Sequence, residues 1–246
     1  MQDVFTRYEK KFLITKGQAA SLVAALNERM KPDLYDSYWV QNLYFDTENW
    51  DVIHTSMQRP YYKEKMRLRY YGTPDGASEA YLELKKKYAG VVYKRRIALP
   101  LAAITSPLEE VLASHQTQIA KELDFYLRTN KVSQKMFVAY RRRAFSCDEH
   151  PGLRLTLDTD IRYRSDELHF QEPNEGRIVL SDDYQLMEIK FPASIPLWLA
   201  RLCSENGIFA TTYSKYARCF TNYVLLENAK KKDGDDPCKS YYPPAT

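Results

Sequence analysis

The chain has 246 residues, which suits one large domain or two small ones, and its 44% hydrophobic and 28% charged residues are ordinary for a soluble globular protein. A net charge of +4 gives no indication of a basic nucleic-acid coat, and no stretch approaches the roughly 18 apolar residues of a membrane span, so neither nucleic acid nor a membrane is expected as a direct partner. The polar N-terminus is unlike a signal peptide and the four cysteines lack paired spacing, which predicts reduced thiols and a cytoplasmic location.

Three helices are predicted, in chain order, over residues 15–30, 106–127 and 196–207. Thr15 and Gln18 form a capping box at the start of the first helix. A proline at the first helical position begins the second helix, which has a break near Ser114. The remainder of the domain, up to residue 228, is predicted to form strands, and the charged, Pro-rich residues 229–246 a disordered tail.

An unusual alternation marks the predicted strands, because charged side chains occupy one face and apolar side chains the other. It is present in residues 65–71, 81–87, 153–161 and 187–191. An ordinary antiparallel sheet with one face in water would explain any single strand. Like charges on one face repel, however, so several such strands favour a sheet that curls around an anion. Its interior would be cationic, and helices would cover its apolar outer face.

Such an interior suits a chain of phosphates, because Arg binds phosphate oxygens bidentately and Lys adds a point charge. A lone carboxylate among the cations suits Mg²⁺, which commonly takes one or two carboxylates, substrate phosphates and waters. The histidines lack metal-ligand spacing, and the glycine-rich phosphate-loop, nucleophile-elbow and dinucleotide motifs do not occur. The run 141–143 is not one basic surface, because Arg142 faces away from its neighbours in extended backbone.

Nine short motifs follow one another over residues 5–225. They are Arg7–Phe12, Leu43–Thr47, Arg67–Gly72, Leu82–Lys85, Tyr93–Arg96, Tyr140–Phe145, Leu157–Asp160, Met187–Lys190 and Tyr213–Tyr216. No single motif is specific. Together and in this order they resemble the VTC domain, the polyphosphate-polymerase branch of the triphosphate tunnel metalloenzymes, which are also called CYTH-like proteins.

The resemblance implies an α+β fold, with an eight-stranded antiparallel β tunnel flanked by helices in one domain over residues 1–228. It implies transfer of the γ-phosphoryl group of a nucleoside triphosphate (ATP) onto a polyphosphate chain, with Mn²⁺ or Mg²⁺ as cofactor. The implied partners are therefore a nucleoside triphosphate and polyphosphate. A stand-alone cytoplasmic enzyme is expected, and a membrane-protein partner for export is left open.

By motif position, the resemblance also implies which residues form the site. The phosphate-binding residues would be Lys11, Arg67, Arg69, Lys85, Lys94, Arg142, Lys190, Ser214 and Lys215. The catalytic residues would be Arg67, Arg69, Lys85, Lys94, Arg142 and Glu188. Glu188 would hold the metal, with Glu83 and Asp158 as weaker candidates. Tyr44 and Tyr140 are expected to pack or hydrogen-bond in the tunnel wall.

One departure from the family pattern bears on the reaction. Hydrolytic relatives carry an ExExK motif on the first strand, whereas this chain has Arg7-x-Glu9-x-Lys11. The missing carboxylate favours the polymerase over the two-metal hydrolase. Three alternatives stay open: a tunnel triphosphatase that hydrolyses tripolyphosphate or nucleoside triphosphate, a non-catalytic module that binds polyphosphate or inositol phosphate, and, as a weaker option, an RNA-binding protein.

Overall fold

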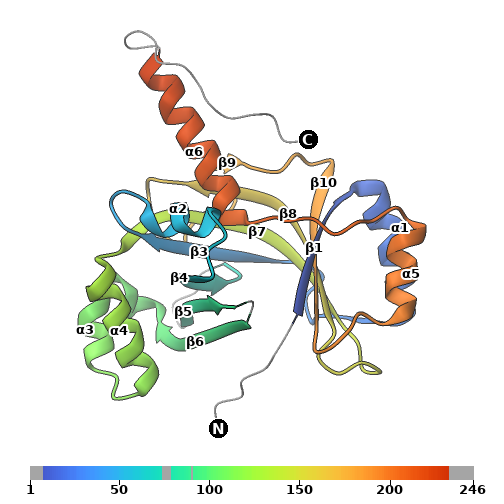
Figure 1. Cartoon of the computed structure of the whole chain (residues 1–246), viewed down its shortest axis with the longest axis horizontal. Helices are drawn as coiled ribbons and strands as arrows, with labels where there is room; N and C mark the ends of the chain where they lie inside the picture. The colour runs from blue at the N-terminus through green and yellow to red at the C-terminus, as the bar shows by residue number, and fades with distance from the viewer. Residues whose placement is uncertain (1–7, 74–78, 90, 233–246) are drawn as a thin grey trace.

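The computed structural model describes residues 8–73, 79–89 and 91–232. All strands are antiparallel and belong to one sheet (Figure 1). The long strands are β1 (Tyr8–Thr15), β3 (Tyr38–Asp46), β4 (Tyr62–Tyr71), β5 (Glu79–Tyr88), β6 (Val91–Pro100), β7 (Ser133–Ser146), β8 (Arg154–Arg164) and β10 (Tyr184–Phe191). Two-residue strands, β2 (Lys31–Pro32) and β9 (Arg177–Ile178), pair with β7 and β8.

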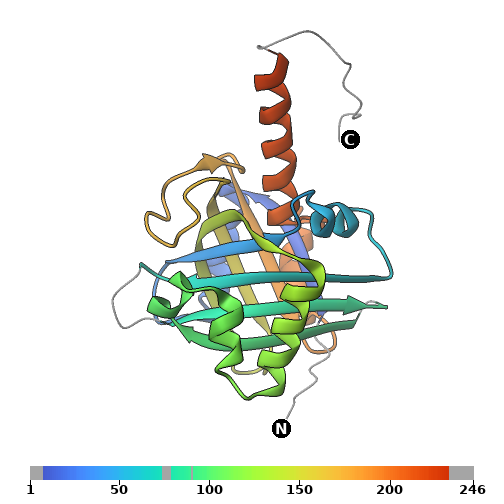
Figure 2. The ribbon, with the colours of Figure 1, turned by 90° about the vertical axis from the view of Figure 1, so that its left-hand side faces the viewer.

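The long strands follow the order β1-β10-β8-β7-β3-β4-β5-β6 and curl around a common interior (Figures 1 and 2). Strands β4, β5 and β6 form one wall, the β4–β6 wall, and β1, β10 and β8 form the opposite wall. Within the described residues, no pairing joins the end strands β1 and β6. The α+β class and the antiparallel sheet are therefore confirmed, but the sheet has ten strands rather than eight and the expected closed barrel is not confirmed.

The apolar outer face of the β4–β6 wall packs against two helices, α3 (Leu108–Ala113) and α4 (Gln118–Asn130), as Figure 2 shows. Met66 and Leu82 from this face are fully buried in the same cluster as Leu123. The break between the two helices lies at the predicted place, and a short 3₁₀ helix, η1 (Leu101–Thr105), precedes them. Burial of this face directs the charged side chains of the same strands into the interior.

The opposite wall is covered in the same way by α1 (Lys16–Leu26) and α5 (Leu197–Glu205). Leu155 and Ile189 from its outer face share a buried cluster with Leu22. The predicted capping box at the start of α1 is present, because Thr15 and Gln18 exchange side-chain and backbone hydrogen bonds. Both walls thus confirm the predicted alternation, with a mainly apolar outer face and a charged inner face.

Two helices were not predicted, α2 (Asp51–Met57) and α6 (Lys215–Lys232). Asp46 joins both to β3, because its carboxylate accepts hydrogen bonds from the backbone of α2 and from the Tyr216 hydroxyl at 2.8 Å. The far end of α6 projects from the body (Figure 1). It runs four residues beyond the predicted boundary at 228, so residues 229–232 are helical rather than disordered; 233–246 lie outside the described residues. No described helix is both long and apolar enough to cross a membrane.

Candidate functional site

The interior face of the β4–β6 wall carries charged side chains in rungs, meaning rows of residues that lie directly opposite one another on neighbouring strands. The rungs are Lys63–Lys87, Lys65–Lys85–Lys94, Arg67–Glu83–Arg96 and Arg69–Tyr81. Residues two apart on a strand point to the same face, so all four rungs face the interior. Lys65 and Arg96 were not predicted as site residues, although each lies two positions from a predicted one and shares its face.

Glu83 organises the cations of its rung. Glu83 is 1% exposed, and its carboxylate accepts two hydrogen bonds from Arg67, at 2.9 and 2.8 Å. Lys94 lies 2.5 Å and Arg96 2.8 Å from the other carboxylate oxygen. Burial disfavours the charged carboxylate, but Arg67, Arg69 and Lys94 outweigh burial and hold the pKa of Glu83 well below its usual range. The carboxylate therefore stays ionised and fixes three cations in place.

Lys65 and Lys85, in the neighbouring rung, lack such a partner. No described carboxylate lies within ion-pair distance of either ammonium group. Burial and the charges of Lys63 and Lys85 lower the pKa of Lys65 to about 7. Burial also lowers the pKa of Lys85 to about 8, and the negative charge of Glu9 opposes this shift only in part. The Lys85 side chain nevertheless keeps access to water within the interior. Both ammonium groups would be stabilised by an anion between the walls.

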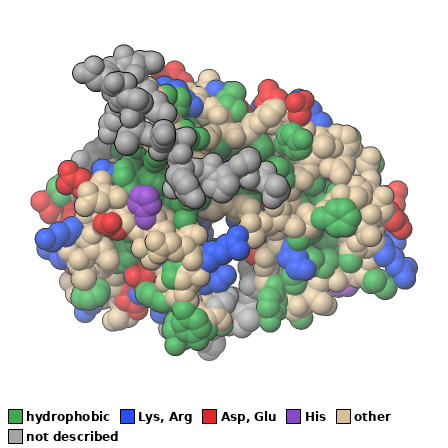
Figure 3. Space-filling view, turned by 45° about the horizontal axis from the view of Figure 1, so that its top comes forward, with side chains coloured by type: hydrophobic (Ala, Val, Ile, Leu, Met, Phe, Trp, Pro, Cys, Tyr) green, Lys and Arg blue, Asp and Glu red, His purple; other side chains and the backbone are tan. Residues whose placement is uncertain are grey.

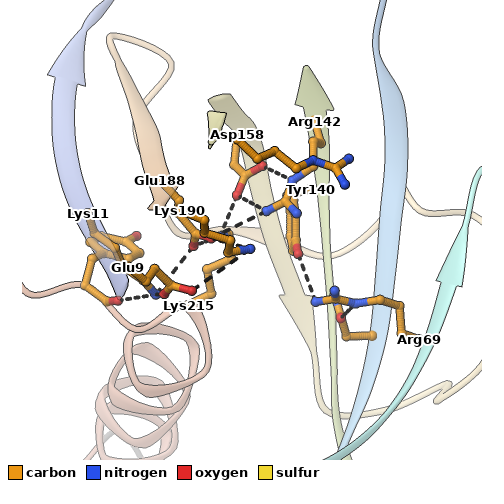
Figure 4. Close-up of polar contacts among 12 residues, drawn as sticks. Glu9, Lys11, Arg69, Tyr140, Arg142, Asp158, Glu188, Lys190 and Lys215 are labelled. Carbon is orange, nitrogen blue, oxygen red and sulfur yellow. Dashed lines mark hydrogen bonds and ion pairs between the residues drawn. The ribbon is translucent and has the colours of Figure 1, made fainter. Parts of the chain in front are cut away.

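A second charged network lies where β7, β8, β10 and the start of α6 meet (Figure 4). Arg142 donates two hydrogen bonds to Asp158, at 2.6 and 2.7 Å. Lys215 reaches both Asp158, at 2.6 Å, and Glu188, at 3.0 Å. Burial opposes ionisation of Asp158, but Arg142 and Lys215 lower its pKa. Arg142 is buried while its neighbour Arg141 is exposed, which confirms that the run of three arginines is not one surface.

Two carboxylates on neighbouring strands, Glu9 and Glu188, share two lysines. Lys11 lies 3.4 Å from Glu188 and 3.5 Å from Glu9, and Lys190 lies 3.8 and 4.0 Å from the same two groups. Burial is outweighed at Glu188 by Lys215, Lys11 and other cations, which hold its pKa well below the usual range. Glu9 was not predicted as a site residue, although it precedes Lys11 by two positions and so shares its face.

Tyrosines connect the two walls. Arg69 donates hydrogen bonds to Asn42 at 2.9 Å and to the Tyr140 hydroxyl at 3.3 Å (Figure 4). The Tyr140 ring lies 4.5 Å from the Lys215 ammonium group, so it touches cations of both networks. Tyr44 accepts a hydrogen bond from Arg67 at 3.4 Å. Both tyrosines therefore occupy the hydrogen-bonding wall positions expected from the sequence.

The two walls face each other closely enough for their charges to interact. After burial, Lys85 on β5 is the strongest influence on the pKa of Glu9 on β1, and it lowers that pKa. In the space-filling view, a hollow opens near the middle of the molecule and Lys and Arg side chains border it (Figure 3). Ser214 differs from the other predicted phosphate ligands, because its hydroxyl accepts a hydrogen bond from the Ala217 backbone at 3.3 Å and caps α6.

The carboxylates meet the requirements of a divalent metal only in part. Among the residues that the structure describes, no group of three or more His, Cys, Asp or Glu side chains is arranged to hold a metal ion. Mg²⁺ and Mn²⁺ sites, however, often combine one or two carboxylates with substrate phosphates. Glu9 and Glu188, gathered around shared lysines, fit that pattern. Glu83 already contacts three cations and Asp158 two, and their role as metal ligands stays a prediction.

The chain was compared with family models, with curated proteins and with solved structures. The family model described as the VTC domain matches residues 6–223. No curated protein matches the sequence. Among solved structures, a candidate adenylate cyclase from Bacillus halodurans has a TM-score of 0.49 and 14% identity, over 87% of this chain and 95% of that one. A candidate adenylate cyclase from Vibrio parahaemolyticus has a TM-score of 0.48 and 10% identity, over 88% and 98% of the two chains.

Proposed function

The chain belongs to the VTC domain family, and from this membership and the charges of the interior we propose that it transfers the γ-phosphoryl group of a nucleoside triphosphate, ATP, onto a polyphosphate chain. One observation carries the proposal: cations from both walls surround one interior, and Lys65 and Lys85 among them have no carboxylate in ion-pair distance among the described residues. That interior supports a ligand with many negative charges in a row, which a triphosphate and a polyphosphate share.

Phosphoryl transfer asks little covalent chemistry of the protein, because alignment and charge neutralisation supply most of the catalysis. In the proposed reaction, a terminal oxygen of the polyphosphate chain attacks the γ-phosphorus, and the bond from that phosphorus to the bridging oxygen breaks. The nucleoside diphosphate leaves with the bond electrons. The attacking oxygen is already ionised, so the reaction needs no general base.

Residues on the two sides of the interior would have different roles in this reaction. Arg67, Arg69 and the Lys65–Lys85–Lys94 rung would bind the triphosphate, and Glu83 holds Arg67 and Lys94 in fixed positions for it. From the other side of the interior, Lys11 on β1, Arg142 on β7 and Lys215 at the start of α6 would stabilise charge on the transferring group and guide the acceptor chain. A bound Mn²⁺ or Mg²⁺, held by Glu188 with Glu9 beside it, would supply further charge neutralisation.

Incubation of the protein with ATP and Mn²⁺, followed by electrophoresis of the products, tests this proposal. We expect a ladder of long polyphosphate chains, and loss of that ladder in Arg67→Gln. Arg95→Gln is the matched control, because Arg95 lies on the outer face of β6 and pairs with Glu122 at 2.7 Å. A yield of only ADP and orthophosphate would instead support the hydrolase. Arg7, the residue on which the sequence-based preference for the polymerase over the hydrolase depended, lies outside the described residues.

Affinity for tripolyphosphate is expected to fall as the pH rises through the pKa values of Lys65, about 7, and Lys85, about 8. Above these values the free protein carries neutral amines, and binding must first protonate them. Each lysine that must take up a proton should reduce the affinity by at most about tenfold per pH unit above its pKa. Calorimetry in buffers of different ionisation enthalpy should therefore record proton uptake on binding near pH 8.

The double variant Lys65→Gln and Lys85→Gln provides the control for this pH dependence. Protonation of the ligand itself is the same for both proteins, so the difference between them isolates the two lysines. Proton uptake that persists unchanged in the variant would assign the effect to other groups.

A further inference from the structure

The outermost rung of the β4–β6 wall, Lys63–Lys87, lies beyond the residues that the proposed reaction uses. Lys63 and Lys87 lie directly opposite each other, as do Lys65 and Lys85 in the next rung. No described carboxylate forms an ion pair with any of these four lysines. Lys63 instead donates a hydrogen bond to the Ser56 backbone carbonyl of α2, at 3.2 Å. Four lysines therefore line one end of the interior, beside α2.

The presence of four lysines opposite one another, with no carboxylate within ion-pair distance among the described residues, calls for a physical explanation. Like charges directly opposite each other on neighbouring strands destabilise a sheet. Lysines on an edge strand protect against aggregation, but Lys87 on β5 pairs with residues of both β4 and β6, and only the part of β4 before Arg67 has no paired residue on β3. Burial, together with the charges of Lys87 and Arg59, lowers the pKa of Lys63, so its charged form is disfavoured while no anion is present. A bound anion would remove this repulsion.

The two ends of the interior differ in chemistry. At the other end of β4, Tyr71 and Gly72 line a cavity of about 390 Å³ together with Leu34, Tyr35 and Tyr38. That end is aromatic and partly apolar, whereas the Lys63–Lys87 end presents only cations on these two strands. From Lys63 to Arg69 the strand extends for about 20 Å at its usual rise per residue, which is long enough for several phosphate groups in a row.

We propose that Lys63 and Lys87, next to the Lys65–Lys85–Lys94 rung, form a subsite for linear inorganic polyphosphate at the α2 end of the interior. The subsite binds phosphates several units away from the reacting group and holds the chain while it grows. The proposed subsite rests on the proposed function, because that function identifies polyphosphate as the ligand. Its test, however, is a binding measurement that needs no turnover. A chain of phosphates has no apolar part, and this favours the lysine end over the aromatic one.

The experiment compares tripolyphosphate with a long-chain polyphosphate in calorimetric titrations of the wild type and of Lys63→Gln combined with Lys87→Gln. We expect the affinity for the long chain to fall about tenfold or more, which corresponds to about 1.4 kcal/mol. The affinity for tripolyphosphate, which is too short to fill both subsites, should change less than about twofold. In the polymerase assay, the same variant should release shorter products.

Lys86→Gln is the matched control, because Lys86 is the neighbour of Lys87 in sequence but lies on the outer face, paired with Glu64 at 3.2 Å. It should leave both affinities unchanged. Since Lys63 also contacts α2, the single variant Lys87→Gln is measured as well: its side chain is exposed and its loss leaves the fold intact. An affinity for long chains that stays unchanged in Lys87→Gln and in the double variant would overturn the proposal.

Two further outcomes would also overturn it. Equal losses for tripolyphosphate and the long chain would show a general electrostatic effect without a subsite. Displacement of the long chain by RNA, with the same sensitivity to Lys63 and Lys87, would assign the rung to nucleic acid. The proposed function fails differently, when the wild type binds long chains through this rung but forms no polymer from ATP.

Discussion

Replacing Glu188 by glutamine is expected to lower turnover about 100-fold while tripolyphosphate binding stays the same or becomes tighter. The Glu188 carboxylate lies 3.0 Å from Lys215 and 3.4 Å from Lys11, and it is the carboxylate that the family resemblance assigns to the metal. Its removal takes one negative charge from the interior, which favours a bound anion. The same change releases Lys11 and Lys215 from their common partner, so the transferring group is no longer aligned. Steady-state rates and calorimetric titrations of one preparation measure both effects.

Glu64→Gln is the control for this variant, because Glu64 lies on the outer face of β4 and pairs with Lys86. It should retain both binding and turnover. A Glu188 variant that turns over at the wild-type rate would remove Glu188 from the reacting centre. A variant that loses binding together with turnover would show that Glu188 shapes the binding site instead of serving the transfer step.

The direction of each side chain in the sheet could be predicted from sequence because it depends on local geometry. A period of two places Arg67 and Arg69 on one face of β4 and Met66 on the other wherever the chain is extended, and the structure confirms this. The same rule places Lys65 and Glu9 in the interior. Lys65 lies outside the family motifs, whereas Glu9 belongs to the first motif but was not among the residues to which the resemblance gave a role.

Contacts between segments that are distant in the sequence could not be predicted from the sequence and became known only from the structure. Lys215 contacts Asp158 and Glu188, which lie on two other elements, and a local pattern does not predict such a meeting. The helix that begins at Lys215 was also missed, because its Tyr, Phe, Val and Thr residues favour strands and the cap at Ser214 has no Glu or Gln three positions later. The register between strands decides whether a cation has a carboxylate within ion-pair distance among the described residues, as Arg67 has in Glu83, or has none, as is the case for Lys65.

Replacing Asp158 by asparagine is expected to lower the free energy of unfolding by about 3–5 kcal/mol, the usual cost of breaking a buried ion pair. The Asp158 side chain is fully buried and contacts both Arg142, at 2.6 Å, and Lys215, at 2.6 Å. Asparagine leaves both cations buried, with Glu188 as their remaining carboxylate. Urea-induced unfolding, followed by circular dichroism, measures the loss. Asp124→Asn removes an exposed helical pair with Arg128 and should cost no more than about 0.5 kcal/mol.

Acid unfolding gives a second measurement of how much the Asp158 carboxylate contributes to stability. The pKa of Asp158 is lower in the folded protein than in the unfolded chain, so its stabilisation is present above the unfolded value of about 3.9 and is lost as the pH falls through the folded value. Stability of the Asp158→Asn protein should therefore depend less on pH in the acid range. If this variant instead keeps its stability but loses turnover, Asp158 acts on the metal, for which the family resemblance makes it a weaker candidate than Glu188, and the ion pairs with Arg142 and Lys215 give way when the substrate binds.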